Sequence, residues 1–106
     1  MDALILHRKE FGKMCLAPNS FSLEDYDIAA NYNADIDSVT DFLEMAYEAT
    51  NSIDYHWSEN EGIAVSGDYS KRSTSVGDIV WLEKDGHGEI WEVRPMGFKL
   101  IHFVGA

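Results

Sequence analysis

The last third of the chain constrains the fold most, because it reads as three consecutive strands joined by two short loops. The segments DIVWLE, EIWEV and FKLIHFV are rich in β-branched and aromatic residues, and KDGHG and RPMG separate them. Short loops that carry glycine favour tight reversals, which make successive strands antiparallel. The sequence therefore predicts an antiparallel C-terminal β-meander.

Both faces of the predicted meander carry apolar side chains. In the last strand two sets alternate, Phe98, Leu100, His102 and Val104 against Lys99, Ile101 and Phe103. Successive strand residues point to opposite sides of a sheet, so neither face reads as fully solvated. We expect a sheet that is covered on both faces, at least in part, or strongly curled.

One amphipathic helix is predicted at about residues 38–51. Its apolar residues recur at i, i+3, i+4, i+7 and i+8, the spacing of one helix face: Val39, Phe42, Leu43, Ala46 and Tyr47. Ser38 stands where an N-cap is needed.

The remaining elements are shorter. Ser22 followed by Leu23, Tyr26 and Ala30 predicts a second, shorter helix at about residues 22–31. The apolar runs 3–7 and 63–65 predict an N-terminal strand and a further short strand. The expected fold class is α+β: one domain, residues 1–106, with the meander packed against the main helix.

The charge is concentrated in the middle of the chain. The protein carries 19 Asp and Glu against 8 Lys and Arg, a net charge of -11, and residues 14–68 contain twelve carboxylates and no Lys or Arg. A net charge of magnitude about 2 to 8 suffices to keep a small domain soluble. Solubility alone is therefore a weak explanation for the larger net charge of this protein. Direct binding to nucleic acid is disfavoured, because phosphates need clustered cations. A basic protein is the expected partner, for example a host nucleic-acid-binding enzyme.

Four of these carboxylates follow one face of the main helix. Asp37, Asp41, Glu44 and Glu48 are spaced by four, three and four residues, which would stack them in a row about 16 Å long. A merely solvated face usually mixes charges of both signs, and this one does not. The candidate partner-binding residues are Asp37, Asp41, Glu44, Glu48, Glu24, Asp25, Asp27, Asp35, Trp57, Glu59 and Glu61.

No catalytic, metal or cofactor site is predicted. Cys15 is the single cysteine, and His7, His56, His87 and His102 form no His-x3-His or Cys/His pattern. His56 with Glu59 and Glu61 brings acid and base types together, but a lone histidine is more often structural. The absence of a membrane-length apolar run or an export signal and the single cysteine indicate a cytoplasmic protein, in a host cytoplasm if a phage encodes it. The oligomeric state stays open.

Four segments, in this order, resemble a family of small proteins carried by phages and plasmids: EATNSID, WSENEG, RSTSVGDIV and WEVRPMGF. Their common pattern is a helix ending in Thr-Asn, a Trp-Ser/Thr-x-Asn segment, an Arg-Ser-x-Ser-Val-Gly-Asp turn and a strand ending in Gly-Phe. The last two pieces are similar to the YodL-like domain. The resemblance spans residues 40–100 and implies a mobile-element accessory protein. It supplies no catalytic residues.

Two functions remain open from the sequence. In the first, the acidic middle binds a basic, nucleic-acid-binding partner as an inhibitor or a DNA mimic. In the second, the chain is a non-inhibitory structural or accessory domain that docks through its β-meander and exposed aromatic residues. We expect the first if the carboxylates share one face of the folded protein.

Overall fold

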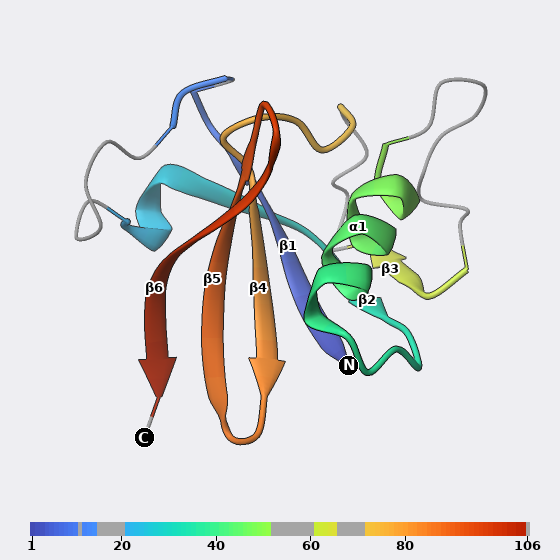
Figure 1. Cartoon of the computed structure of the whole chain (residues 1–106). Coiled ribbons are helices and arrows are strands. Elements are labelled where there is room, and N and C mark those ends of the chain that lie inside the picture. The colour runs from blue at the N-terminus through green and yellow to red at the C-terminus, as the bar shows by residue number, and fades with distance from the viewer. Residues whose placement is uncertain (11, 15–20, 52–60, 66–71, 106) are drawn as a thin grey trace.

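The computed structural model describes residues 1–10, 12–14, 21–51, 61–65 and 72–105. These form six strands, one α-helix and one 3-10 turn (Figure 1). In chain order they are β1 (Asp2–Arg8), the 3-10 turn η2 (Leu23–Asp25), β2 (Tyr26–Asn33), α1 (Val39–Ala49), β3 (Ile63–Val65), β4 (Ile79–Lys84), β5 (His87–Arg94) and β6 (Gly97–Gly105).

The six strands form one antiparallel sheet in the order β3-β2-β1-β4-β5-β6. The predicted α+β class, the meander β4-β5-β6, the N-terminal strand and the short strand β3 are confirmed. The two-residue loop between β4 and β5 consists of Asp85 (φ 50°) and Gly86 (φ 83°). Positive φ at both positions is the geometry that matches the right-handed twist of paired strands.

The predicted second helix at 22–31 is wrong. Only η2 is helical there, and the following residues form β2, which pairs with β1 on one side and β3 on the other. The register between β1 and β2 shifts beside Ile5, so that Ala29 is an extra residue in β2. Ala29 and Ala30 are therefore both buried. With Tyr26, the buried residues of this strand fall at i, i+3 and i+4, which is also the spacing of a helix face.

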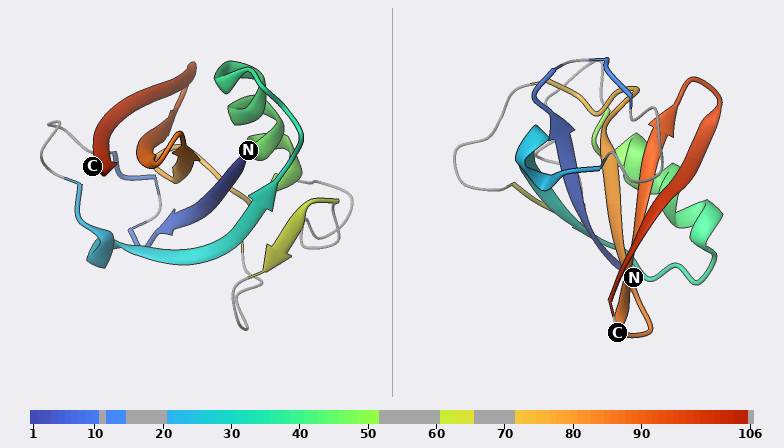
Figure 2. Two further views of the ribbon diagram at one scale, coloured as in Figure 1. Left: turned by 90° about the horizontal axis from the view of Figure 1, so that it is seen from below. Right: turned by 90° about the vertical axis from the view of Figure 1, so that its left-hand side faces the viewer.

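Helix α1 covers one face of the sheet. Ser38 caps it by accepting a hydrogen bond from the Asp41 N–H at 3.3 Å, and Phe42, Leu43 and Ala46 are buried against β1, β2 and β4. A second cluster occupies the other face: Leu6, Tyr26, Ile79, Ile90 and Ile101. The sheet is strongly curled (Figure 2), which agrees with the apolar residues on both faces of its strands.

The segment 72–78 is fixed between β1 and the end of α1. The buried carboxylate of Asp78 accepts hydrogen bonds from the backbone N–H groups of Arg8 and Ser75, each at 2.7 Å, and from the Arg72 guanidinium at 2.5 and 2.8 Å. Arg72 is therefore paired with Asp78 within its own turn. On the other side, the Thr74 N–H donates to the Thr50 carbonyl at 2.9 Å, which holds the segment at the end of α1.

No helix in the described part of the chain is long and apolar enough to cross a membrane.

Candidate functional site

The exposed face of α1 carries three of the four carboxylates that the sequence placed there. Asp41, Glu44 and Glu48 are exposed, and the seven residue steps from the first to the last cover about 10 Å of helix. Asp37 is also exposed but precedes the N-cap, so it lies in the segment that connects β2 to α1. The helical row is accordingly shorter than the predicted 16 Å.

These three carboxylates form no ion pair with any described residue. The arginines of the described ranges pair elsewhere: Arg8 with Asp25, Arg72 with Asp78, and Arg94 with Glu92. The last turn of α1 contains no basic residue. The negative charge of α1 is therefore not neutralised by these arginines and is presented to solvent.

Asp35 and Glu61 extend the charge of α1 toward the β2-β3 edge of the sheet. Together with Glu48 they line a pocket of about 450 Å³ beside Tyr32 and Met45. The pKa of the Tyr32 hydroxyl is raised above its usual value, first by burial and then by the negative charges of Glu61 and Glu48. Carboxylates from three segments of the chain thus line one pocket. We name Asp35, Asp41, Glu44, Glu48 and Glu61 the α1 acidic surface.

The other predicted acids do not join this surface. Glu24 and Asp25 line a separate pocket of about 270 Å³ with Arg8, Lys9 and Lys13, and the Arg8 guanidinium is 3.9 Å from the Asp25 carboxylate. Figures 1 and 2 place η2 and α1 at opposite sides of the molecule.

Three further candidates complete the predicted set. Asp27 is exposed near the start of β2, opposite His7 of β1. Trp57 and Glu59 lie outside the described residues. The predicted acids therefore do not all share one face, and the α1 acidic surface is the larger of two separate groups.

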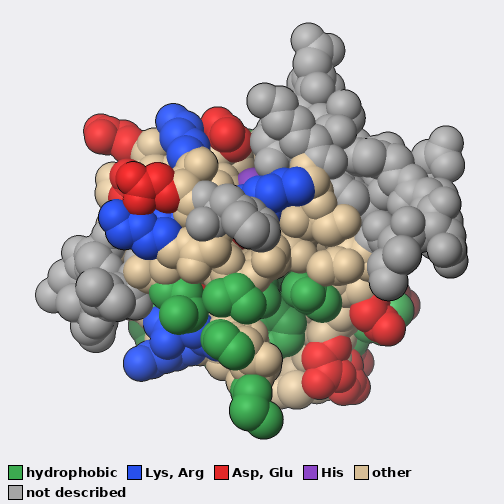
Figure 3. Space-filling model, turned by 90° about the horizontal axis from the view of Figure 1, so that it is seen from above, with side chains coloured by type: hydrophobic (Ala, Val, Ile, Leu, Met, Phe, Trp, Pro, Cys, Tyr) green, Lys and Arg blue, Asp and Glu red, His purple; other side chains and the backbone are tan. Residues whose placement is uncertain are grey.

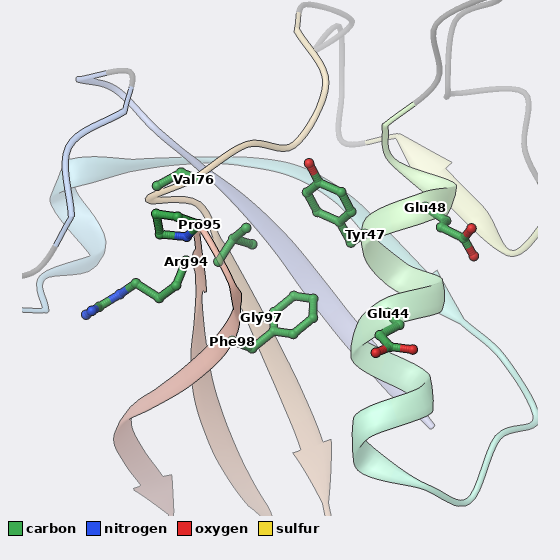
Figure 4. Close-up of a pocket in the computed structure, with 9 residues that line it drawn as sticks. Glu44, Tyr47, Glu48, Val76, Arg94, Pro95, Gly97 and Phe98 are labelled. Atoms are coloured by element: carbon green, nitrogen blue, oxygen red, sulfur yellow. The ribbon is translucent and has the colours of Figure 1, made fainter.

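A groove of about 470 Å³ lies between α1 and the β5-β6 turn (Figure 4). Glu44, Tyr47 and Glu48 line it from the helix, and the turn and the 72–78 segment contribute Val76, Val93, Arg94, Pro95, Gly97 and Phe98. The Tyr47 and Phe98 rings meet edge to face, with centroids 6.5 Å apart.

No local pattern in the sequence predicts this groove. Tyr47 was predicted to belong to the buried face of the helix, and Phe98 to a strand. Both side chains are only partly buried. The two residues are about fifty positions apart, and only the packing of α1 beside the meander brings them together.

The charge of Arg94 is directed away from the groove. Its Nε donates to the buried Glu92 carboxylate at 2.5 Å. Glu92 lies directly opposite Ile79 in the register of β4 and β5, and Ile79 belongs to the core cluster on the other face of the sheet from α1. Glu92 therefore points to that other face. Figure 4 shows the Arg94 guanidinium pointing away from α1. Glu44 and Glu48 are consequently the charged side chains that determine the sign of the field on the helix side of the groove.

The surface above the groove divides by charge and polarity. Figure 3 shows hydrophobic side chains gathered on this face, carboxylates to their lower right on the side of α1, and mixed acids and bases at the upper left. Met96, at the tip of the β5-β6 turn, is 95% exposed. The carboxylates of α1 and the apolar β5-β6 turn are thus exposed on the same face of the molecule.

Among the described residues, no group of three or more His, Cys, Asp or Glu side chains is arranged to hold a metal ion. No protein-family model, curated protein or solved structure matches the chain. The resemblance to YodL-like mobile-element proteins accordingly stays a prediction.

Proposed function

We propose that the chain is a protein-interaction module whose α1 acidic surface binds a basic segment of a partner protein. The observation that carries the proposal is the exposure of Asp41, Glu44 and Glu48 without an ion pair to any described residue. A protein that used these carboxylates only for solubility would gain by interleaving Lys or Arg, since like charges four residues apart destabilise a helix. A cationic partner supplies the missing charge and is drawn to the surface at low salt.

The density of charge favours a short basic segment over a DNA-binding channel. Duplex DNA presents one charge per about 1.7 Å of its axis, whereas successive carboxylates of α1 are about 5 Å apart. Glu24 and Asp25, which would have to raise this density, lie at the other side of the molecule beside cations. The surface therefore supports a decoy for a few basic side chains better than a full DNA mimic.

The biological setting follows from the sequence resemblance. A mobile-element accessory protein that binds a basic host protein would act in the host cytoplasm and would inhibit the protein that it occupies. The resemblance supports this setting by analogy, and the interaction itself can be tested without knowledge of the host.

The test is binding of a fluorescein-labelled peptide with four Arg and four Lys separated by Gly. We expect Asp41→Asn with Glu48→Gln to weaken this binding by about tenfold, each lost charge contributing about 0.5 to 1 kcal/mol. The matched control is Glu24→Gln with Asp27→Asn, which removes the same charge from the other side and should change the affinity by less than twofold.

Two results would count against the proposed function. If both double variants weaken the peptide equally, binding follows net charge and no surface is specialised. If neither variant matters and binding is insensitive to salt between 50 and 300 mM, the interaction is not electrostatic.

One observation favours the alternative of an accessory domain that docks through the meander. Phe103, a large aromatic side chain on β6, is 60% exposed. Should a natural partner be found whose binding is insensitive to salt and is lost in Phe103→Ser, this alternative would replace the acidic-surface proposal.

A further inference from the structure

We propose that the groove between α1 and the β5-β6 turn seats one arginine side chain of the basic partner segment, with its guanidinium at Glu44 and its alkyl stem along Phe98. This inference rests on the proposed function and names the side chain that gives the contact its specificity.

The volume of the groove, about 470 Å³, lies in the lower part of the range for ligand pockets, about 300 to 1,000 Å³. It is too small for the apolar face of a docked helix, which uses several side chains over two turns. It can accept one long side chain together with the backbone that carries it.

The lining changes from apolar to anionic across the groove. Val76, Val93 and Phe98 supply apolar surface, while Glu44 and Glu48 stand on the helix side. Figure 4 shows the Phe98 ring directed toward α1, Glu44 on the front of the helix, and Glu48 on its outer side. A side chain with an apolar stem and a cationic head matches this order, with Glu44 as the direct partner.

The aromatic part of the groove is fixed before any ligand arrives. The Tyr47 hydroxyl accepts a hydrogen bond from Asn51 Nδ2 at 2.9 Å, and the same Nδ2 donates to the Thr74 carbonyl at 2.8 Å. The Tyr47 ring in turn meets Phe98 edge to face. Because these rings are already held, little side-chain entropy is lost when a stem packs against them.

The charges of the groove exclude the other classes of occupant. An anionic side chain would be repelled by Glu44 and Glu48, and the Arg94 guanidinium that could attract it is turned toward Glu92 on the other face. A purely apolar side chain would desolvate Glu44 without replacing its water. Arginine is favoured over lysine, because its planar guanidinium stacks on aromatic rings and is more weakly hydrated.

The experiment replaces one arginine at a time in the peptide of four Arg and four Lys. At one position, we expect lysine to weaken binding about threefold to fivefold and citrulline, the neutral isostere, by at least tenfold. These losses should shrink to less than twofold in Glu44→Gln, because the variant has already lost the partner of that arginine.

Phe98→Leu tests the stem contact, and Phe103→Leu is its matched control on the same strand outside the groove. We expect the first to weaken the peptide about threefold and the second to leave the affinity unchanged. The free energy of unfolding of each variant, from urea denaturation, separates a lost contact from a lost fold.

The outcomes distinguish the two proposals. If every arginine tolerates lysine equally and the two Phe variants behave alike, the groove is not an arginine pocket, while charge-dependent binding to the α1 acidic surface stands. If norleucine at that position binds as well as arginine, the groove takes an apolar side chain and this inference is overturned. If the peptide ignores Asp41→Asn with Glu48→Gln as well, the proposed function falls with it.

Discussion

His7 shows how a buried titratable residue couples stability to pH. The ring is 1% exposed on β1, and its Nε2 lies 2.9 Å from the Thr74 hydroxyl. Burial lowers the pKa of His7 from 6.5 to about 4; the charges of Asp78 and Asp27 act in the opposite direction, and that of Arg72 adds to the decrease. The folded protein therefore holds the imidazole neutral where the unfolded chain would protonate it.

The first prediction follows from the sign of this shift. Above pH 6.5 both states are neutral and His7 has no effect. Between pH 6.5 and 4 only the unfolded state binds the proton, so stability falls as pH falls, by about 3 kcal/mol in total. In urea denaturation at pH 7 and pH 4, His7→Gln should lose less stability between the two values than the unaltered protein does.

His102→Gln is the control, because His102 is exposed on β6. The comparison between variants matters, since any other effect of pH on stability is common to all of them. An unchanged pH dependence in His7→Gln would mean that His7 is protonated or solvated in the folded protein.

Gly77 differs from Gly86 in the space that its surroundings leave for a side chain. Both Gly77 (φ 93°) and Gly86 (φ 83°) adopt backbone angles that disfavour other residues. A Cβ on Gly77 would stand 2.2 Å from the Lys13 carbonyl oxygen, whereas one on Gly86 would meet nothing within 4 Å. The glycine of the Ser-Val-Gly-Asp turn is thus required by a contact as well as by its conformation.

The second prediction compares the two alanine variants. Gly86→Ala should cost about 1 kcal/mol from the backbone angle alone, and Gly77→Ala should cost at least about 2 kcal/mol more, because backbone atoms must move. Urea denaturation at pH 7 measures both. Equal losses would show that the Lys13 segment moves away at no cost.

At the scale of elements, local patterns predicted α1 from its helical period, β1 and β3 from short apolar runs, and the meander from strand-rich segments between glycine-bearing loops. They failed at 22–31 because the bulge at Ala29 and pairing to strands distant in sequence decide the conformation of β2. The bonds of Asp78 combine local and distant contacts: its bond to the Ser75 N–H is local, but its bond to the Arg8 N–H spans 70 residues.

The third prediction concerns the position of the charges along α1. The N-terminal end of a helix favours a negative charge and the C-terminal end disfavours it. Asp41 lies in the first turn, and Glu48 lies in the last turn, where no basic residue stands. Glu48→Gln should therefore raise the free energy of unfolding by a few tenths of a kcal/mol, and Asp41→Asn should lower it by a similar amount.

Thermal unfolding at low ionic strength, followed by circular dichroism, measures both changes. Because the two variants remove the same charge, opposite signs identify the helix dipole as the cause. A shift of the same sign in both would indicate general repulsion within the acidic surface instead. A stabilising Glu48→Gln that also weakens peptide binding would show that the carboxylate is kept at a cost to the fold.

At the scale of the whole molecule, the sequence showed that the charge is concentrated but not how it is distributed in space. The spacing of Asp41, Glu44 and Glu48 follows from one helix and was readable. The addition of Asp35 and Glu61, and the separation of Glu24 and Asp25, depend on which side of the sheet each segment lies. The groove depends on the same packing, so no local pattern could reveal it.

The position of β1 between β2 and β4 has a consequence for synthesis of the protein. Asp2 at one end of β1 is paired with Glu83 of β4, so the β1-β4 pairing is complete only after about eighty further residues have been made, which takes several seconds at about 5 to 20 residues per second. Until then α1 has left the ribosome without the strand that buries part of its apolar face. A stop codon placed just after α1 should consequently yield a fragment that chaperones retain, even though it contains most of the acidic surface.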